Sequence, residues 1–200
     1  MTDKKQERVY ALFEQYGPVL KTNKLRENKI FSRDIAELIS NKKIRKIKTG
    51  FYIRTQDKNN MSDLEIASAI IPNGIICLQS AASYYDLTTI NPISVYVAIP
   101  SNGMRPVLPS QPPIELVVTP ARLFTLGISE QDDSQSKLRI YNKERTICDF
   151  FRKRNQIGED IAIEVLRNYM QGKRDLQRLF EYAEQFRIKT VLKPYVEAMI

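Results

Sequence analysis

Three polar side chains near the start of the chain have the chemistry that reads a DNA sequence. Arg33, Ser40 and Asn41 can form hydrogen bonds with base edges in the grooves of a duplex. Lysine and arginine residues surround them in the sequence, and such cations contact phosphates, which positions a protein without reading bases. Together with Thr22, these further candidate contacts are Lys21, Lys24, Lys42, Lys43, Arg45, Lys46 and Lys48. The residue types predict a surface that binds double-stranded DNA.

The positive charge of the chain is concentrated in the same region. The formal net charge is +8. Residues 1–54 contain 14 Lys or Arg against 6 Asp or Glu, whereas residues 55–200 contain 17 of each. A local excess of cations favours a polyanionic partner, because each neutralised phosphate releases counterions. The alternative is a solvated surface whose lysines serve solubility.

The remaining residue types argue against catalysis. The chain has no histidine, which removes the commonest general base and every Ser–His or Cys–His nucleophile. No glycine-rich phosphate loop occurs. Cys77 and Cys148 lie in apolar segments, so we expect two buried, reduced thiols, which are too few for a zinc site. We predict neither an enzyme nor a cofactor. A metal at Asp132 and Asp133 is the less favoured alternative for their polar loop.

The second part of the chain contains a candidate polar cluster. Arg145, Thr146 and Asp149 share one predicted helix, and Arg145 and Asp149 are spaced as an i, i+4 pair. One interpretation is an exposed ion pair on the helix surface, which contributes little to stability. The sharper interpretation is a partly buried brace between helix and sheet, and we favour the brace over a catalytic role. Ser80 has no histidine to activate it, and we expect a helix N-cap or a packing residue.

Three short helices and a hairpin must position the candidate DNA contacts. Apolar residues at helical spacing predict helices over residues 7–16, 22–27 and 33–42. Thr22 and Ser32 are the expected N-caps of the last two. In the third helix Ile35, Leu38 and Ile39 are expected to face inward, and residues 43–54 form a basic hairpin that turns at 49–50.

This order predicts a winged helix-turn-helix, whose third helix enters the major groove while the hairpin follows phosphates or the minor groove. The alternative is a three-helix scaffold that binds a protein partner.

The rest of the chain mixes strands and helices. After a polar linker at residues 55–62, helices are expected at 63–71, 78–87, 144–154, 159–171, 175–186 and 190–199. Strands are expected at 74–77, 93–99, 114–119 and 138–141. The fold class is therefore α+β, with an N-terminal domain at 1–56 and a C-terminal domain of mixed sheet and helices at 62–200. No apolar run has membrane-spanning length and the N-terminus lacks a signal-peptide core, so a cytoplasmic location is expected.

Four motifs in this order resemble a known family. They are KIRKIKTGFYIR, GIICLQSAASYYDL, ISVYVAIP and NKERTICDFFRKR, and the chain resembles the AbiEi-type antitoxins of bacterial type IV toxin–antitoxin systems. The resemblance covers residues 8–187 and depends on the order and spacing of the motifs, since none is diagnostic alone. Where the family pattern often has His-Gly-Leu, this chain has Tyr85, Asp86 and Leu87. Any role of that histidine therefore has no counterpart here.

The resemblance implies both a function and partners. A winged helix would bind inverted repeats in the operator DNA upstream of its own operon and repress it. The C-terminal domain would counteract a nucleotidyltransferase-like toxin of an abortive-infection, phage-defence system, with or without direct contact. The alternative is a protein-interaction module or generic regulator that binds a partner protein directly.

Overall fold

The structure is a computed structural model that describes residues 3–57, 61–133 and 136–200. It divides into two compact units. The first contains residues 1–72, 106–114 and 132–138, and the second contains residues 73–105, 115–131 and 139–200. The chain is α+β, with helices and a small antiparallel sheet at the N-terminus, then a mixed five-stranded sheet and C-terminal helices.

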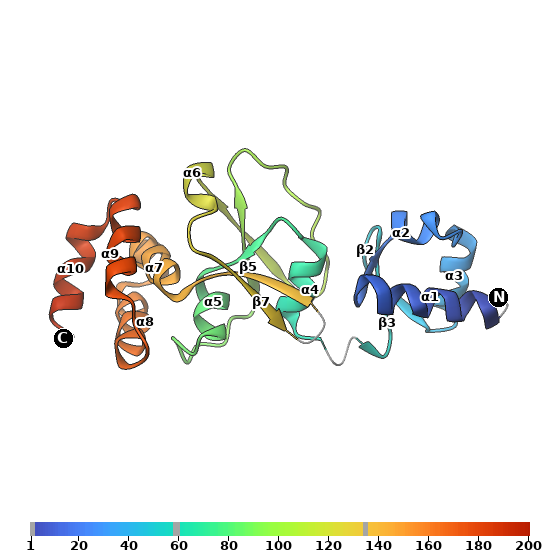
Figure 1. The fold of residues 1–200 in the computed structure, drawn as a ribbon, viewed down its shortest axis with the longest axis horizontal. Coiled ribbons are helices and arrows are strands. Elements are labelled where there is room, and N and C mark those ends of the chain that lie inside the picture. The colour runs from blue at the N-terminus through green and yellow to red at the C-terminus, as the bar shows by residue number, and fades with distance from the viewer. Residues whose placement is uncertain (1–2, 58–60, 134–135) are drawn as a thin grey trace. The chain divides into compact units, whose positions relative to one another are not determined.

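The first unit combines four helices with a three-stranded sheet. Helices α1, α2 and α3 gather beside the small sheet (Figure 1), whose strand order is β1-β3-β2 with both pairs antiparallel. The elements are α1 (Asp3–Tyr16), β1 (Val19–Lys21), α2 (Thr22–Glu27), α3 (Ser32–Ser40), β2 (Ile44–Lys48), β3 (Phe51–Arg54) and α4 (Asp63–Ile70). The predicted helices and hairpin are all present, whereas β1 was not predicted.

One apolar core holds these elements together. Val9, Leu12 and Phe13 on the inner face of α1 pack with Leu25 of α2 and Leu38 of α3. The spacing of these residues puts them on one face of each helix, as the sequence predicted. Because α3 and β2 both contribute to this core, the core fixes the helix and hairpin that carry the candidate DNA contacts.

The helix starts in this unit differ from the predicted N-caps. Helix α3 begins at Ser32, so its N-cap is Phe31, and the Asp34 carboxylate accepts a 3.0 Å hydrogen bond from the Phe31 N–H. The predicted Ser32 cap is wrong because this acidic side chain three residues inside the helix satisfies the N–H at its start. Thr22 is likewise the first residue of α2, and Lys21 is the N-cap.

The predicted third helix was also two residues too long. Lys42 adopts the left-handed conformation, with φ of 54°. The N–H of Lys42 donates to the Ile39 carbonyl at 3.0 Å, and that of Lys43 donates to the Leu38 carbonyl at 2.9 Å. This pair of bonds is a Schellman motif, which ends the helix at Ser40.

The larger sheet is mixed and has the strand order β6-β5-β4-β8-β7. Strand β4 pairs antiparallel with β5 and parallel with β8. The strands are β4 (Ile75–Ile76), β5 (Val95–Pro100), β6 (Ile114–Thr119), β7 (Ile128–Asp133) and β8 (Ser136–Tyr141). The helices are α5 (Leu78–Tyr84), α6 (Ala121–Phe124), α7 (Lys143–Ile157), α8 (Glu159–Gln171), α9 (Leu176–Gln185) and α10 (Lys189–Glu197).

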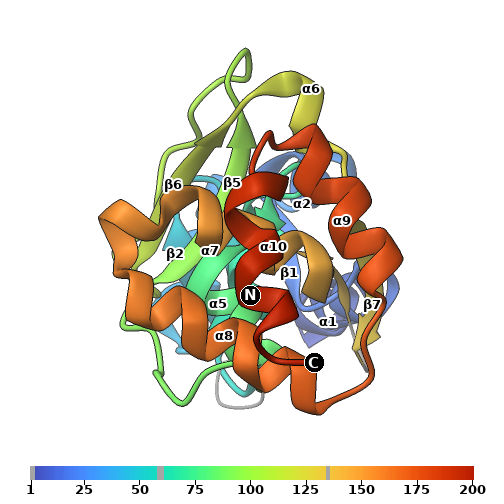
Figure 2. The same cartoon turned by 90° about the vertical axis from the view of Figure 1, so that its left-hand side faces the viewer.

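The last four helices form one group. Figures 1 and 2 agree in showing α7, α8, α9 and α10 packed together, and their buried residues belong to one core with residues of β4, β5 and β8. Asn142 caps α7 as predicted, because its Oδ1 accepts a hydrogen bond from the Arg145 N–H at 2.9 Å. None of the helices in the described part of the chain combines the length and apolarity needed to cross a bilayer.

Candidate nucleic-acid interface

Helix α3 presents a polar outer face. Ile35 and Leu38 are buried in the core, so the residues on the opposite side point to solvent. Arg33, Ser40 and Asn41 are all exposed there or at the end of the helix. Ile39, which was predicted to face inward, has 38% of its surface exposed. That prediction is wrong because the residues of α3 that lie in the core are Ile35 and Leu38, and Ile39 lies beside that face.

The hydrogen bonds within α3 limit what its polar side chains can do. The Ser40 hydroxyl donates to the Glu37 carbonyl at 2.9 Å, so its oxygen is left to accept from a partner. Asn41 is the C-cap, and its backbone N–H bonds to the Glu37 carbonyl. Its side-chain amide can both donate and accept, which is the requirement for pairing with adenine in the major groove.

The hairpin β2–β3 follows α3 directly. Its turn contains Gly50, whose φ of 83° is a conformation that other residues rarely adopt. The Gly50 carbonyl accepts a 2.9 Å hydrogen bond from the N–H of Thr22, which ties the turn to the start of α2. The strand register shifts between Lys46 and Lys48, so β2 carries an irregularity near its end.

Two predicted phosphate contacts are occupied within the protein. Lys48 Nζ donates to the carbonyl of Ile70 at 3.0 Å and to that of Val107 at 2.9 Å. Burial lowers the pKa of Lys48, and the positive charge of Lys21 lowers it further. Lys24 Nζ forms a 2.9 Å ion pair with the Glu27 carboxylate. Lys48 is thus turned inward, and the charge of Lys24 is balanced by its neighbour.

The other predicted cations are open to solvent. Lys21 is exposed, and its ammonium lies 5.5 Å from the centre of the Phe51 ring. The exposed group at the end of α3 and along β2 forms no salt bridge with any described residue. It consists of Lys42, Lys43, Arg45 and Lys46. These four cations and Arg33 of α3 are available to an external anion.

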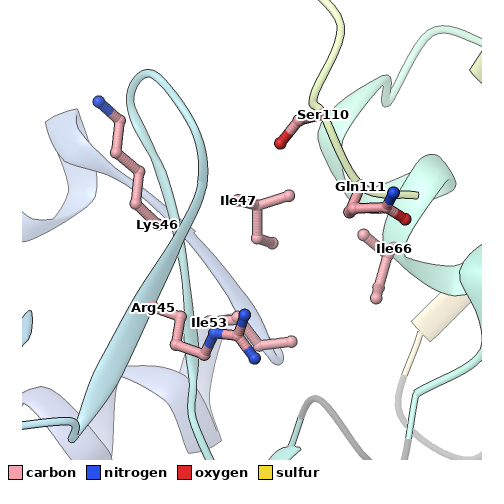
Figure 3. Close-up of a pocket in the computed structure, with 7 residues that line it drawn as sticks. All are labelled: Arg45, Lys46, Ile47, Ile53, Ile66, Ser110 and Gln111. Atoms are coloured by element: carbon pink, nitrogen blue, oxygen red, sulfur yellow. The ribbon is translucent and has the colours of Figure 1, made fainter. Parts of the chain in front are cut away.

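A small hollow of about 150 Å³ lies along the hairpin. Figure 3 shows Lys46 and Ile47 on opposite sides of β2, with Ile47 directed toward Ser110 and Gln111. The apolar side chain of Ile66 in α4 also lines this hollow. One side of β2 therefore meets α4 and the 106–114 segment, while the Lys46 side chain extends away from them.

Thr55 was assigned to a polar linker, but it extends the hairpin. Its N–H donates to the Lys43 carbonyl at 3.1 Å, which adds one more backbone hydrogen bond between the two arms of the hairpin beyond the end of β3. Its hydroxyl oxygen is buried without a hydrogen-bond partner among the described residues. The residues that follow Thr55 are polar, so the sequence predicted a linker from residue 55 onward and not an extension of the hairpin.

The polar cluster of the second unit is buried. Arg145 has 0% of its surface exposed and donates to Asp149 at 3.0 Å. Its Nη1 donates to the carbonyls of Leu123 and Leu126, both at 2.6 Å. The guanidinium carbon lies 3.8 Å from the ring centre of Tyr141. The pair thus connects α7 to the α6 region and to β8, which is the arrangement of an internal brace.

Ser80 and Thr146 also form internal contacts. The Ser80 oxygen accepts from the N–H of Tyr96 at 2.9 Å, which links α5 to β5. Ser80 is not the N-cap of α5, because Cys77 occupies that position. The Thr146 hydroxyl donates to the carbonyl of Asn142 at 2.9 Å, within the first turn of α7. Each side chain in this cluster has a structural partner.

The structure gives no metal centre among the side chains it describes, since they contain no group of three or more potential acidic or thiol ligands. The side chains of Asp132 and Asp133 lie outside the described residues. Both cysteines are buried and reduced. Burial raises the pKa of the Cys77 thiol well above its ordinary value, and the nearby Asp149 charge raises it further.

Comparison of the sequence with models of protein families and with curated proteins finds no match.

Proposed function

We propose that this protein binds operator DNA through an N-terminal winged helix-turn-helix and acts as an AbiEi-type antitoxin. The observation that carries the DNA-binding proposal is the position of the unpaired cations. The exposed face of α3 is followed directly by the exposed cations at its end and along β2, in the part of the chain that holds the whole excess of positive charge. A recognition helix beside a basic hairpin matches the shape and charge of a duplex.

The proposed contacts fall into two classes. Arg33, Ser40 and Asn41 on the exposed side of α3 read base edges, because their side chains offer hydrogen-bond donors and acceptors at that surface. Lys42, Lys43, Arg45 and Lys46 contact phosphates, with Lys21 and Thr22 at the start of α2 in a supporting role. The internal hydrogen bonds of Lys48 give it a structural role in the hairpin.

The antitoxin part of the proposal comes from the family resemblance. The C-terminal domain would counteract a nucleotidyltransferase-like toxin, and the winged helix would repress the shared operon. The buried partners of Arg145 and Asp149 support a structural role for this pair in that domain. We propose no catalytic activity for the chain and no cofactor.

Fluorescence anisotropy with duplexes from upstream of the gene tests the DNA-binding proposal. Replacing Arg33 or Asn41 by alanine should reduce discrimination between operator and random duplex by about 1–3 kcal/mol per lost bidentate contact. Replacing Lys46 by alanine should weaken binding to both duplexes equally and reduce the salt slope by about one. Wild-type protein that binds neither duplex at low salt would exclude DNA binding.

Co-expression tests the antitoxin proposal separately. If the neighbouring gene encodes a nucleotidyltransferase-like protein, its expression alone should arrest growth, and expression of this chain should restore growth. Restoration by a variant without DNA binding, such as the combined replacement of Arg33 and Lys46, would assign neutralisation to the C-terminal domain. Growth arrest that this chain does not relieve contradicts the antitoxin assignment.

One observation favours the alternative of a protein partner for the first unit. Phe31 has 58% of its surface exposed and Ile39 has 38%, and both belong to α3 or its N-cap. Exposed aromatic and aliphatic side chains are typical of protein interfaces. If a partner protein covers this face, replacing Phe31 by serine should abolish the complex and leave DNA affinity unchanged.

A further inference from the structure

The connection between β5 and β6, residues 101–113, is held to the hairpin by one hydrogen bond. Its later part, residues 106–113, belongs to the first unit, as the hairpin does. Residues 104–113 lie outside helices and strands, and within the described part of the chain they take part in a single hydrogen bond. In that bond the Val107 carbonyl accepts from Lys48 Nζ at 2.9 Å. A segment with so few hydrogen bonds opens easily, so the bond from Lys48 matters for its position.

Packing does little to fix this part of the connection. The Val107 side chain has 74% of its surface exposed. Figure 3 shows Ile47 of β2 directed toward Ser110 and Gln111, but a hollow of about 150 Å³ lies among these side chains. Close packing restrains a segment because it leaves no free space, and here space remains. The link between β2 and Val107 is therefore chiefly the polar one from Lys48.

The same ammonium restrains the turn of the hairpin. Lys48 is the last residue of β2, and its Nζ also donates to the carbonyl of Ile70, the last residue of α4, at 3.0 Å. Helix ends leave carbonyls without partners and attract cations. The ring centre of Phe51, the first residue of β3, lies 4.5 Å from the ammonium, which is a cation–π contact. One charged group thus joins both arms of the hairpin to the end of α4 and to the β5–β6 connection.

We propose that Lys48 is a positioning residue for DNA binding and that it couples the hairpin turn to the β5–β6 connection. This inference rests on the DNA-binding function proposed above. While Lys48 holds the Val107 carbonyl, the turn and the cations Arg45 and Lys46 keep one arrangement. When the connection moves away, the turn gains freedom, and docking on a duplex costs more conformational entropy. The state of the connection therefore sets DNA affinity, although Lys48 itself contacts no phosphate.

Lys48→Met in the full chain tests the positioning role, because it removes the donors and keeps an unbranched side chain. Affinity for duplexes from upstream of the gene should fall about threefold to tenfold, since the turn must then be ordered on docking. The salt slope should not change, because it counts neutralised phosphates. In protein without DNA, the ¹⁵N order parameters of the Gly50 and Val107 amides should fall from about 0.85 to below 0.6. Lys4→Met removes the same charge from an exposed position of α1 and should change none of these quantities.

A second variant tests the coupling from the other side with Lys48 in place. Pro106→Gly combined with Pro109→Gly frees the backbone of the connection, because proline fixes φ and glycine does not. We expect weaker DNA binding and a lower Gly50 order parameter, and little further effect in the Lys48→Met background, where the link is already absent. Pro92→Gly is the matched control, since Pro92 lies in the loop before β5, with which Lys48 forms no hydrogen bond.

The outcomes separate this proposal from the DNA-binding one. A salt slope reduced by about one in Lys48→Met, with unchanged order parameters, would make Lys48 a phosphate contact and overturn the positioning role. Equal effects of the proline replacements in the wild-type and Lys48→Met backgrounds would overturn the coupling. If no duplex binds at low salt, the DNA-binding function fails. The coupling then stands only if the proline replacements still lower the Gly50 order parameter in the absence of DNA.

Discussion

Arg145 illustrates how a single residue can connect several elements. It is fully buried, pairs with Asp149, donates to two backbone carbonyls and lies against the Tyr141 ring. Its ring contacts and the hydrogen bonds of Nε and Nη1 replace part of the water that a guanidinium normally binds, while Nη2 is buried with no hydrogen-bond partner among the described residues. These contacts give a physical reason for an arginine at that position.

Removal of Arg145 should destabilise the second unit strongly. Arg145→Ala leaves the buried Asp149 carboxylate without its partner, and the expected loss is about 3–5 kcal/mol of unfolding free energy, measured by urea denaturation. Replacing both residues together, as Arg145→Met with Asp149→Leu, should cost less, because no buried charge remains. Lys193→Ala is the control, since it removes an exposed pair with Glu197 and should change stability by about 0.5 kcal/mol or less. Equal losses in the two single variants would contradict the brace.

The two thiols should be unreactive in the folded protein. Cys77 and Cys148 are buried, and burial raises both pKa values above the ordinary thiol value. A raised pKa keeps the protonated form as pH increases, and only the thiolate is nucleophilic. Titration with Ellman's reagent at pH 8 should therefore detect no thiol in native protein and two after denaturation in guanidinium. Rapid modification of either cysteine without unfolding would show that its surroundings open in solution.

Several helices end in the same way without a glycine. Helices α2, α3, α5 and α9 are each followed by a residue in the left-handed conformation, and paired backbone hydrogen bonds close each end. The residues are Lys29, Lys42, Asp86 and Arg187, with φ values of 61°, 54°, 56° and 57°. A side chain in this conformation is strained by about 1 kcal/mol or more, so these helix ends are less stable than they could be.

Glycine at one of these positions should stabilise the protein. Arg187→Gly removes the strain at the end of α9, and we expect a gain of about 0.5–1 kcal/mol in urea denaturation. Arg178→Gly is the matched control, because it makes the same substitution inside α9 and should cost about 1 kcal/mol. A loss of stability in Arg187→Gly would mean that the Arg187 side chain has a stabilising contact that outweighs the strain.

These helix ends also explain part of what the sequence could and could not predict. Amphipathic spacing located α1, α8 and α9, because their inner residues repeat with the helical period. The end of α3 was placed too far along, since Lys42 is not a residue type that signals a helix end. Strand β1 is three residues long and exists through its pairing with β3, and the local sequence does not encode that distant partner.

The sequence predicted which residues lie at the candidate site better than it predicted what each of their side chains contacts. The sequence placed Arg33, Arg45 and Lys46 on elements that leave them exposed. It gave Lys48 the same role as Lys46, because the strand pattern does not reveal the register shift between them or the carbonyls of Ile70 and Val107. Whether a lysine faces solvent or the protein depends on segments far away in the chain.

The whole molecule has an uneven charge distribution that can be tested directly. The excess of cations lies within residues 1–54, and the remainder is balanced. Replacing the proposed phosphate contacts Lys43, Arg45 and Lys46 together by alanine should reduce the slope of log affinity for DNA against log salt by up to about three times 0.9. Replacing Lys173, Arg178 and Lys193 removes the same charge from exposed positions near the C-terminus and should leave the slope unchanged. Equal effects of the two sets would mean that DNA responds to total charge and not to a defined surface.

The anchored tip of the β2–β3 hairpin has a kinetic consequence. Its turn is held by the bond from Thr22 to Gly50, and Lys48 beside the turn holds the carbonyls of Ile70 and Val107. A loop that is ordered before it meets a partner loses little conformational entropy on docking. Encounters with a polyanion should therefore be productive without a slow folding step, at a rate set by diffusion and long-range attraction.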